Sequence, residues 1–252
     1  MLFRFIDQWR TMLGMGLGKP NMWDHARMVF CDIPVDAAKV RSWLPFPLRL
    51  ARPARATLFI ADYPKTTFGC VYREAAVLIH ARLFGIFPVL HCPWMVVDCD
   101  QALIWGRELL GYPKKMAQIE FAEGPDGRFH GSVARRGFEV MRFEGAVGAR
   151  DSQPGPGIGR MQVNIRSHIS VFMPGHLLTV RPSETVHEAN QMQLRVELKD
   201  SPYEPLGIAA GPAERATIRT CDIGGGLFPP PMRIWPVGPA FMTRLSHLLR
   251  TR

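Results

Sequence analysis

Glycine and proline recur along the chain so closely that long helices have little room to form. The sequence has 23 glycines and 22 prolines among 252 residues. Proline ends or kinks a helix, and glycine marks turns. Between them, apolar and polar positions alternate with the two-residue period of a half-buried strand. We therefore expect a mainly β, β-rich α+β fold with a few short helices.

The alternation after residue 25 predicts eleven strands, most of them joined by short loops. Arg135-Arg136-Gly137, between two such runs, is typical of a hairpin turn. The predicted strands are residues 27–32, 57–62, 75–82, 94–98, 117–122, 129–135, 138–145, 161–172, 184–190, 194–198 and 213–222.

Three short helices are predicted within the main part of the chain, over residues 35–44, 100–111 and 239–249. In the second, Asp100 is expected to cap the start and Gly111 to stop the end. Pro113 follows directly, so this helix would fix the approach of the next residues.

We expect one domain over residues 1–252, preceded by a helical extension over about residues 1–20. Phe5 and Trp9 share one face of that helix, which would dock on the domain or touch a membrane surface. Arg4 interrupts any signal-peptide core, and no apolar run reaches the ~18 residues that span a bilayer.

Residues 151–159 (DSQPGPGIG) are predicted to be a mobile loop between two β units rather than a phosphate loop. Residues 225–231 are predicted to be a second irregular connection.

The formal net charge of +9 raises the question of nucleic-acid binding. The arginines are scattered, with Arg135-Arg136 the only adjacent pair, so a solvated basic surface that attracts anionic substrates is favoured over nucleic acid.

Five cysteines without CxxC spacing argue against a disulfide framework or a zinc site. Reduced thiols in a cytoplasmic protein fit this usage.

Two lysines stand side by side at Lys114 and Lys115, in a chain with only six lysines. A lysine amine can lose its proton and attack a carbonyl carbon, which an arginine cannot do. A free lysine has a pKa near ~10.4, so the amine must be neutralised first. Repulsion from Lys115 could contribute, but neighbouring side chains on a strand point to opposite faces. Burial, which can shift a lysine pKa by ~3–5 units, is the stronger cause. Taken alone, the pair would more often be two solvated lysines after a helix.

The segment that contains the pair resembles a known family. GRELLGYPKK (residues 106–115) is similar to the GREL…YPKK segment of the acetoacetate decarboxylases. GCVYRE (residues 69–74) is similar to that family's GCY-x-E segment at nearly the family's spacing. VHEA (residues 186–189), the LRVEL strand and the segment 36–48 ending in PFPL extend the likeness over most of residues 25–223.

This resemblance implies that Lys114 is the Schiff-base lysine, Lys115 its neighbouring lysine and Glu74 an active-site carboxylate. It also implies a closed antiparallel barrel or cone, a homo-oligomer, and a lyase that needs no cofactor or metal. The expected reaction is decarboxylation of a small-molecule β-keto acid through a Lys114 iminium and enamine. No nucleic-acid partner and no membrane span are expected.

The chain departs from the family at two places, which puts acetoacetate itself in doubt. Phe59 stands where the family has a second active-site glutamate. The family's arginine near the first strand falls around Trp23 or Asp24, and Arg27 is not matched residue for residue. Two alternatives stay open: an aldolase–dehydratase that uses the same lysine on keto acids and aldehydes, and a non-catalytic protein that binds a small carboxylate.

His187 and Glu188 are the remaining pair that could suggest a metal site. Adjacent residues on a strand point opposite ways, and no second histidine completes a ligand spacing. A structural role for His187 is expected.

Overall fold

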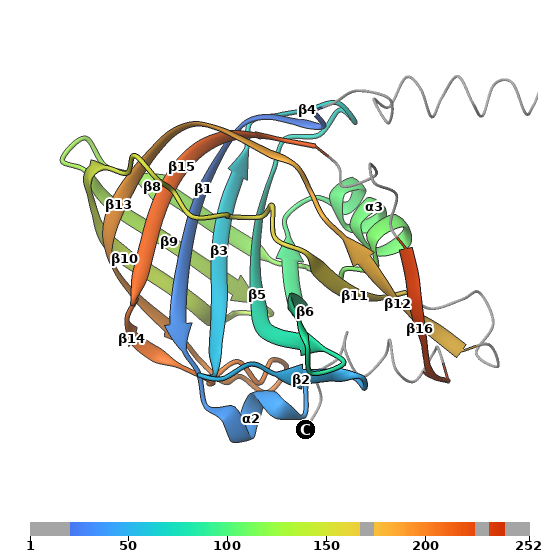
Figure 1. Cartoon of the computed structure of the whole chain (residues 1–252). Helices are drawn as coiled ribbons and strands as arrows, with labels where there is room; N and C mark the ends of the chain where they lie inside the picture. Colours follow the sequence, from blue (N-terminus) through green and yellow to red (C-terminus); the bar gives the residue numbers. More distant parts are fainter. Residues whose placement is uncertain (1–20, 167–173, 225–231, 240–252) are drawn as a thin grey trace, which may run out of the picture.

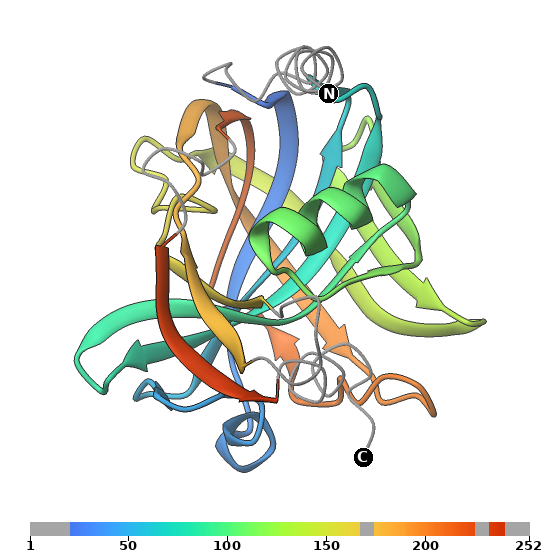
Figure 2. The same cartoon turned by 90° about the vertical axis from the view of Figure 1, so that its right-hand side faces the viewer.

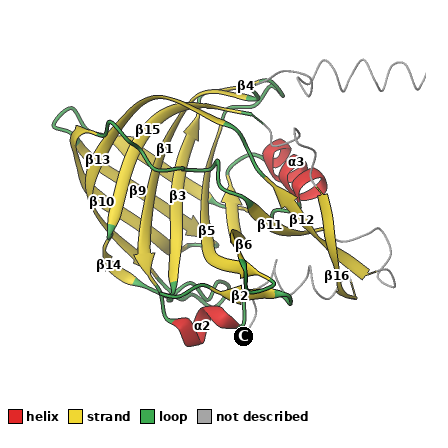
Figure 3. Cartoon of the chain, viewed as in Figure 1, coloured by secondary structure: helices red, strands yellow, loops and turns green. Residues whose placement is uncertain are grey.

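One strongly curved β-sheet forms most of the structure (Figure 1). The computed structural model describes residues 21–166, 174–224 and 232–239. All sixteen strands of these residues belong to the same hydrogen-bonded sheet, and Figure 3 shows how few helices accompany them. The helices of the described part are α2 (Ala37–Arg41) and α3 (Asp100–Leu110). The predicted mainly β fold is therefore confirmed.

Twelve strands form the main path of the sheet, and four short strands pair beside it. From one edge to the other, the path is β16 (Met232–Pro239), β12 (Pro174–Val180), β11 (Gln162–Arg166), β6 (Phe87–Val97), β5 (Tyr72–Leu83), β3 (Arg55–Tyr63), β1 (Trp23–Pro34), β15 (Arg215–Ile223), β13 (Glu184–Leu198), β10 (Phe138–Arg150), β9 (Arg128–Arg135) and β8 (Gln118–Glu123). The short strands are β2 (Leu48–Leu50), β4 (Lys65–Thr66), β7 (Lys114–Met116) and β14 (Ala210–Pro212). The pairs are antiparallel except that β7 and β11 run parallel to β6.

The predicted closure of the barrel is not confirmed. The sheet curls until β8 contacts β3 and β5, but within the described residues no hydrogen-bonded pairing closes it. Side chains fill the space across the curl instead. A Cβ atom at Gly131 of β9, for example, would lie 3.0 Å from the Cδ1 atom of Ile60 on β3. Apolar packing therefore holds the two parts of the sheet together where backbone bonds do not.

Each face of the central strands has its own hydrophobic core. The first core lies inside the curl and includes Val77, Trp94 and Phe143. The second lies on the opposite face and includes Met28 and Met95. Helix α3 covers this second face, where it contacts β6, β7 and β11 (Figure 2). Because both faces are covered, strands such as β5 and β6 are buried almost throughout.

Most predicted strands are present, with shifted ends. Residues 184–190 and 194–198 were predicted as two strands but form the single strand β13. Helix 35–44 is shorter than predicted, as α2. Strands β12 and β16 were not predicted, and neither were the short strands β2, β4, β7 and β14. Pro236 interrupts the sequence of β16, which lies at a sheet edge, where proline is tolerated. The predicted helices at residues 1–20 and 239–249, the connection 225–231 and the end of strand 161–172 lie outside the described residues.

Helix α3 starts and stops within one residue of its prediction. Cys99, rather than Asp100, is the N-cap residue, and the Asp100 side chain accepts a hydrogen bond from the Gln101 N–H. Gly111 ends the helix with a left-handed φ of 69°, and the Tyr112 N–H donates to the Gly106 carbonyl. The predicted hairpin after β9 is also present, with positive φ at Arg136 and Gly137. None of the helices among the described residues has the length and apolarity to traverse a bilayer.

Replacing Gly111 with alanine is expected to destabilise the protein by about 2–4 kcal/mol. A left-handed backbone costs a non-glycine residue about 1–2 kcal/mol, and the new Cβ would also lie 2.9 Å from the Ile165 carbonyl oxygen. Gly137→Ala is the matched control, since Gly137 has φ of 81° with nothing within 4 Å of the added Cβ. Urea unfolding should therefore show a larger loss for Gly111→Ala. Equal losses would mean that crowding against β11 does not matter.

Candidate active site

The two adjacent lysines lie on opposite faces of β7. This strand runs parallel to β6, with Lys114 beside Met95 and Lys115 beside Val96. Met95 belongs to the second core and Val96 to the first. Lys114 therefore points toward α3, while Lys115 points into the curl of the sheet. Adjacency in sequence does not bring the two amines together.

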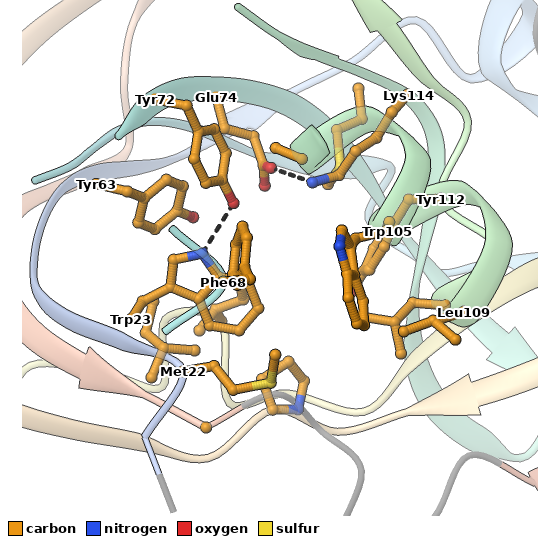
Figure 4. Close-up of a pocket in the computed structure, with 18 residues that line it drawn as sticks. Met22, Trp23, Tyr63, Phe68, Tyr72, Glu74, Trp105, Leu109, Tyr112 and Lys114 are labelled. Atoms are coloured by element: carbon orange, nitrogen blue, oxygen red, sulfur yellow. Dashed lines mark hydrogen bonds and ion pairs between the residues drawn. The ribbon is translucent and has the colours of Figure 1, made fainter. Parts of the chain in front are cut away.

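Lys114 forms a buried ion pair with Glu74. The Lys114 Nζ atom lies 2.5 Å from the Glu74 Oε2 atom, and the two side chains are only 6% and 5% exposed. Glu74 lies on β5, opposite Val97 of β6, so the carboxylate reaches the face that Lys114 also occupies. Figure 4 shows the pair at one end of a cavity. Of the three predicted site residues, the structure thus brings Lys114 and Glu74 together.

The backbone around Pro113 aims Lys114 at this carboxylate. The Lys114 N–H donates to the Tyr112 carbonyl at 2.8 Å, which makes a tight turn between α3 and β7. The Lys114 side chain then passes directly under α3 at Gly106. A Cβ atom at Gly106 would lie 3.0 Å from Nζ and still closer to Cδ and Cε. The glycine of the GREL segment therefore makes the space that the lysine occupies.

A cavity of about 700 Å³, counting its opening to solvent, adjoins the ion pair. Its walls are mainly aromatic and aliphatic, and within the part of the chain that the structure describes Lys114 and Glu74 are its only charged lining residues. Helix α3 supplies one wall and the ends of β1 and β5 supply another. The larger lining side chains are Met22, Trp23, Tyr63, Phe68, Tyr72, Met95, Trp105, Leu109, Leu110, Tyr112, Ile158, Pro182 and Ile223.

Three of the lining residues are tyrosines, each with a polar hydroxyl group. The Trp23 Nε1–H donates to the Tyr72 hydroxyl at 2.8 Å, and the Tyr112 hydroxyl donates to Gln162 Oε1 at 2.9 Å. Burial raises the pKa of Tyr63 and Tyr72 well above the usual value, and the nearby Glu74 carboxylate adds to this shift. Both phenols are therefore neutral at physiological pH. The Tyr72 ring also faces the Lys114 ammonium, with Nζ 5.6 Å from the ring centroid.

Lys115 belongs to a second buried cluster on the other face of the sheet. Its Nζ lies 2.5 Å from Glu204 Oε2, and the Arg135 Nε lies 2.6 Å from Glu204 Oε1. The Trp94 Nε1–H donates to the same carboxylate at 2.8 Å. Glu204 is 1% exposed, so two cations and one indole surround a carboxylate that water barely reaches. The structure thus places the Lys115 amine outside the cavity, where its ion pair with Glu204 holds β7 on the face opposite Lys114.

Of the four residues considered for the chain's departures from the family, Trp23 lines the cavity and the other three do not. Phe59 is fully buried in the second core, 5.7 Å from the Phe30 ring, and does not line the cavity. Arg27 points to the opposite face of β1 and pairs with Glu123 at 2.7 Å. Asp24 pairs with Lys65 on the surface, whereas Trp23 forms part of the cavity wall.

The glycine-rich segment 151–159 connects β10 and β11 of the same sheet and contributes Ile158 to the cavity wall. The Gln162 side chain donates to the Ile158 carbonyl at 3.2 Å, and Arg219 donates to the Gly155 carbonyl at 2.9 Å. The segment is therefore fastened to the sheet beside Lys114. His187, expected to be structural, pairs with Asp222 at 3.0 Å and stacks on His25, away from the cavity residues.

Sequence reasoning did not find the aromatic wall. Trp23, Phe68 and Ile158 come from separate segments that only the folded sheet brings together. The wall formed by α3 did carry a signal, because Ala102, Trp105 and Leu109 recur at helical spacing. This spacing could therefore have predicted that the face of the helix with Ala102, Trp105 and Leu109 lies toward Lys114.

Comparison with known proteins gives a consistent picture. The family model described as acetoacetate decarboxylase matches residues 14–210. Three solved structures are similar over most of both chains. An acetoacetate decarboxylase from Legionella pneumophila is 16% identical with a TM-score of 0.72, and covers 86% of this chain and 88% of its own. An acetoacetate decarboxylase-like enzyme from Sphingomonas wittichii is 22% identical with a TM-score of 0.68, over 88% and 96%. The enduracididine biosynthesis enzyme MppR, complexed with pyruvate, is 20% identical with a TM-score of 0.62, over 81% and 89%.

At these identities the structural likeness concerns the fold alone. A search among curated proteins finds no match.

Replacing Gly106 with alanine is expected to displace Lys114 while leaving the fold intact. Alanine in a helix interior is about 1 kcal/mol better than glycine, which offsets the cost of moving a flexible side chain. A catalytic atom displaced by about 1 Å loses roughly 100-fold in reactivity. Reductive labelling of Lys114 with a carbonyl compound and borohydride should slow by that factor, at unchanged stability. Gln101→Ala, on the exposed part of the same helix, is the control; equal labelling rates in both variants would refute this role of Gly106.

Replacing Glu204 with glutamine is expected to lower the free energy of unfolding by about 3–5 kcal/mol, because Lys115 and Arg135 would stay buried without their carboxylate. Glu197→Gln is the control, since Glu197 is 36% exposed and its pairs with Arg195 and Lys199 lie at the surface. Its loss should stay within about 1 kcal/mol. Denaturant unfolding of both variants measures the difference; a loss near the control value would show that the cluster is not structural.

Proposed function

Because the chain belongs to the acetoacetate decarboxylase family, we propose that it is a lyase that decarboxylates a β-keto acid through a Schiff base on Lys114, without a cofactor. The observation that carries this proposal is the buried Lys114–Glu74 pair at the end of an apolar cavity. An amine that is screened from water, next to a carboxylate that can take its proton, is the arrangement that iminium chemistry requires.

The proposed reaction starts with proton transfer from the Lys114 ammonium to Glu74. The neutral amine attacks the ketone carbon of the β-keto acid, and the adduct loses water to form an iminium cation. Glu74, on the same face and within hydrogen-bond distance of Nζ, is placed to return the proton that the departing hydroxyl needs.

In the next step, the bond between the α-carbon and the carboxylate breaks. Its electron pair moves toward the iminium nitrogen, which forms an enamine and releases CO₂. The enamine takes a proton at the α-carbon, and water hydrolyses the resulting iminium to a ketone and free Lys114. The iminium acts as an electron sink within the substrate adduct, so the chain's own amine suffices for the chemistry.

A second candidate function is condensation of a keto acid with an aldehyde. Its support is the fold shared with MppR, a relative described as complexed with pyruvate. Condensation uses the same iminium and enamine, so Lys114 serves either reaction. The products distinguish them: condensation forms a carbon–carbon bond, whereas decarboxylation releases CO₂. A non-catalytic binding protein is a third candidate, for which Lys114→Ala would leave binding of a small carboxylate largely intact.

Borohydride should trap substrate on Lys114. Reduction turns the iminium into a stable secondary amine, so incubation with a β-keto acid and borohydride should add the mass of the ketone fragment to the peptide that contains Lys114. Lys114→Met should abolish both the adduct and CO₂ release. Lys115→Met should still give the adduct at Lys114, because the Lys115 amine lies on the other face of β7. An adduct at another lysine, or the lack of an adduct with any carbonyl compound, would contradict the proposal.

Glu74→Gln should lower kcat by about 10²–10⁴, the usual contribution of a positioned general acid–base. The glutamine keeps the shape of the side chain but cannot accept the proton of Lys114. The control is Glu120→Gln, which changes an exposed carboxylate on β8. CO₂ release under saturating substrate measures both; full activity of Glu74→Gln would remove Glu74 from the mechanism.

A further inference from the structure

The cavity beside Lys114 is lined almost entirely by apolar side chains. Phe68, Trp105 and Leu109 are only partly buried, although all three line the cavity. Figure 4 shows these side chains around an open space, with the Lys114–Glu74 pair at its far end. The Phe68 and Trp105 rings face one another with centroids 6.2 Å apart. A substrate whose carbonyl carbon reaches Lys114 would extend its remaining atoms along this wall.

Charge in the cavity restricts what that substrate can carry. Among the described residues that line the cavity, Lys114 is the only basic one, and Glu74 already pairs with it. Arg27 is the arginine nearest in sequence to Trp23, the cavity residue of β1. Its side chain lies on the opposite face of β1, where it pairs with Glu123. A carboxylate that persists through the reaction would therefore enter apolar surroundings without a cation of its own, which is unfavourable. A carboxylate that departs as CO₂ loses its charge there, so the same surroundings favour the step.

On the basis of the proposed Schiff-base function, we infer that the substrate is a β-keto acid with a bulky apolar acyl group, aliphatic or aromatic, and that Trp105, Phe68 and Leu109 bind that group. The overall reaction is R–CO–CH₂–CO₂⁻ plus one proton to R–CO–CH₃ plus CO₂, with R the apolar group. The carbonyl carbon would lie at Lys114, the carboxylate would leave from the α-carbon, and R would lie along the wall that Trp105 and Leu109 of α3 form together with Phe68.

The size of the effect follows from burial of methylene groups. Each methylene that leaves water for an apolar site strengthens binding by roughly fourfold. Replacing the acyl methyl of acetoacetate by a pentyl group adds four methylenes. Their burial is expected to raise kcat/KM by roughly 250-fold. Aromatic walls also favour a phenyl group, through edge-to-face contacts with Trp105 and Phe68.

The test compares kcat/KM for acetoacetate, 3-oxooctanoate and benzoylacetate, with CO₂ release as the readout. 3-Oxooctanoate should exceed acetoacetate by roughly 250-fold, and benzoylacetate should also exceed it. Trp105→Ala should remove most of this advantage, at least tenfold, while changing the rate with acetoacetate much less. Ile104→Ala is the matched control, because Ile104 is 55% exposed on the same helix and does not line the cavity. Equal or higher kcat/KM for acetoacetate, or equal effects of Trp105→Ala on all three acids, would overturn the inference.

Binding to an inactive variant separates this inference from the proposed function. Calorimetry with Lys114→Met should show tighter binding of 2-heptanone and acetophenone than of acetone, since the apolar wall is intact. This preference, without CO₂ release by the wild type, would contradict the proposed decarboxylation but support the apolar site. CO₂ release by the wild type, without tighter binding of the two larger ketones, would support the proposed decarboxylation but contradict the apolar site. Saturable binding of pyruvate with carbon–carbon bond formation would overturn the inferred substrate class.

Discussion

Two buried ion pairs on the two faces of β7 are the constraint on which the site depends. Desolvating an ammonium costs several kcal/mol, so a buried lysine needs a carboxylate close by. Glu74 supplies it for Lys114, and Glu204, which Arg135 and Trp94 also hold, supplies it for Lys115. A shift of β7 by one residue would exchange the faces and separate both lysines from their partners. The pairs therefore fix the register of a strand of only three residues.

This arrangement gives the adjacent lysine a different role from the one that adjacency suggests. Lys115 points into the first core, and the sheet itself separates it from the cavity. Its contribution to Lys114 is therefore positional, because its ion pair with Glu204 holds β7 on the first-core face. On the second-core face, the turn at Pro113 and the space at Gly106 position the Lys114 side chain. The alternation of side chains on a strand, already evident in the sequence, decides this division.

The parts that the sequence predicted are those that a local pattern or the family resemblance encodes. Alternation located β3, β5 and β9, and glycine located the end of α3. The resemblance paired Lys114 with Glu74 across 40 residues. Glu204, Trp23 and Ile158 left no such signal, because curvature of the sheet and long connections bring them to β7 and the cavity. Whether the sheet closes also depends on long-range packing: side chains fill the curl where hydrogen bonds were expected.

The apolar cavity and the Lys114–Glu74 pair have to be understood together. In water, a lysine and a glutamate both remain charged, and proton transfer between them is strongly unfavourable. Moving the proton from Nζ to Oε2 turns two buried charges into two neutral groups, and apolar surroundings favour neutral groups relative to water. The apolar surroundings that would bind a bulky acyl group are thus the same surroundings in which the proposed attack by Lys114 would take place. An arginine placed in the cavity would pair with a carboxylate that persists through the reaction, whereas a carboxylate that departs as CO₂ does not need such a partner. The absence of any arginine from the described lining is therefore consistent with a substrate whose charge leaves during the reaction.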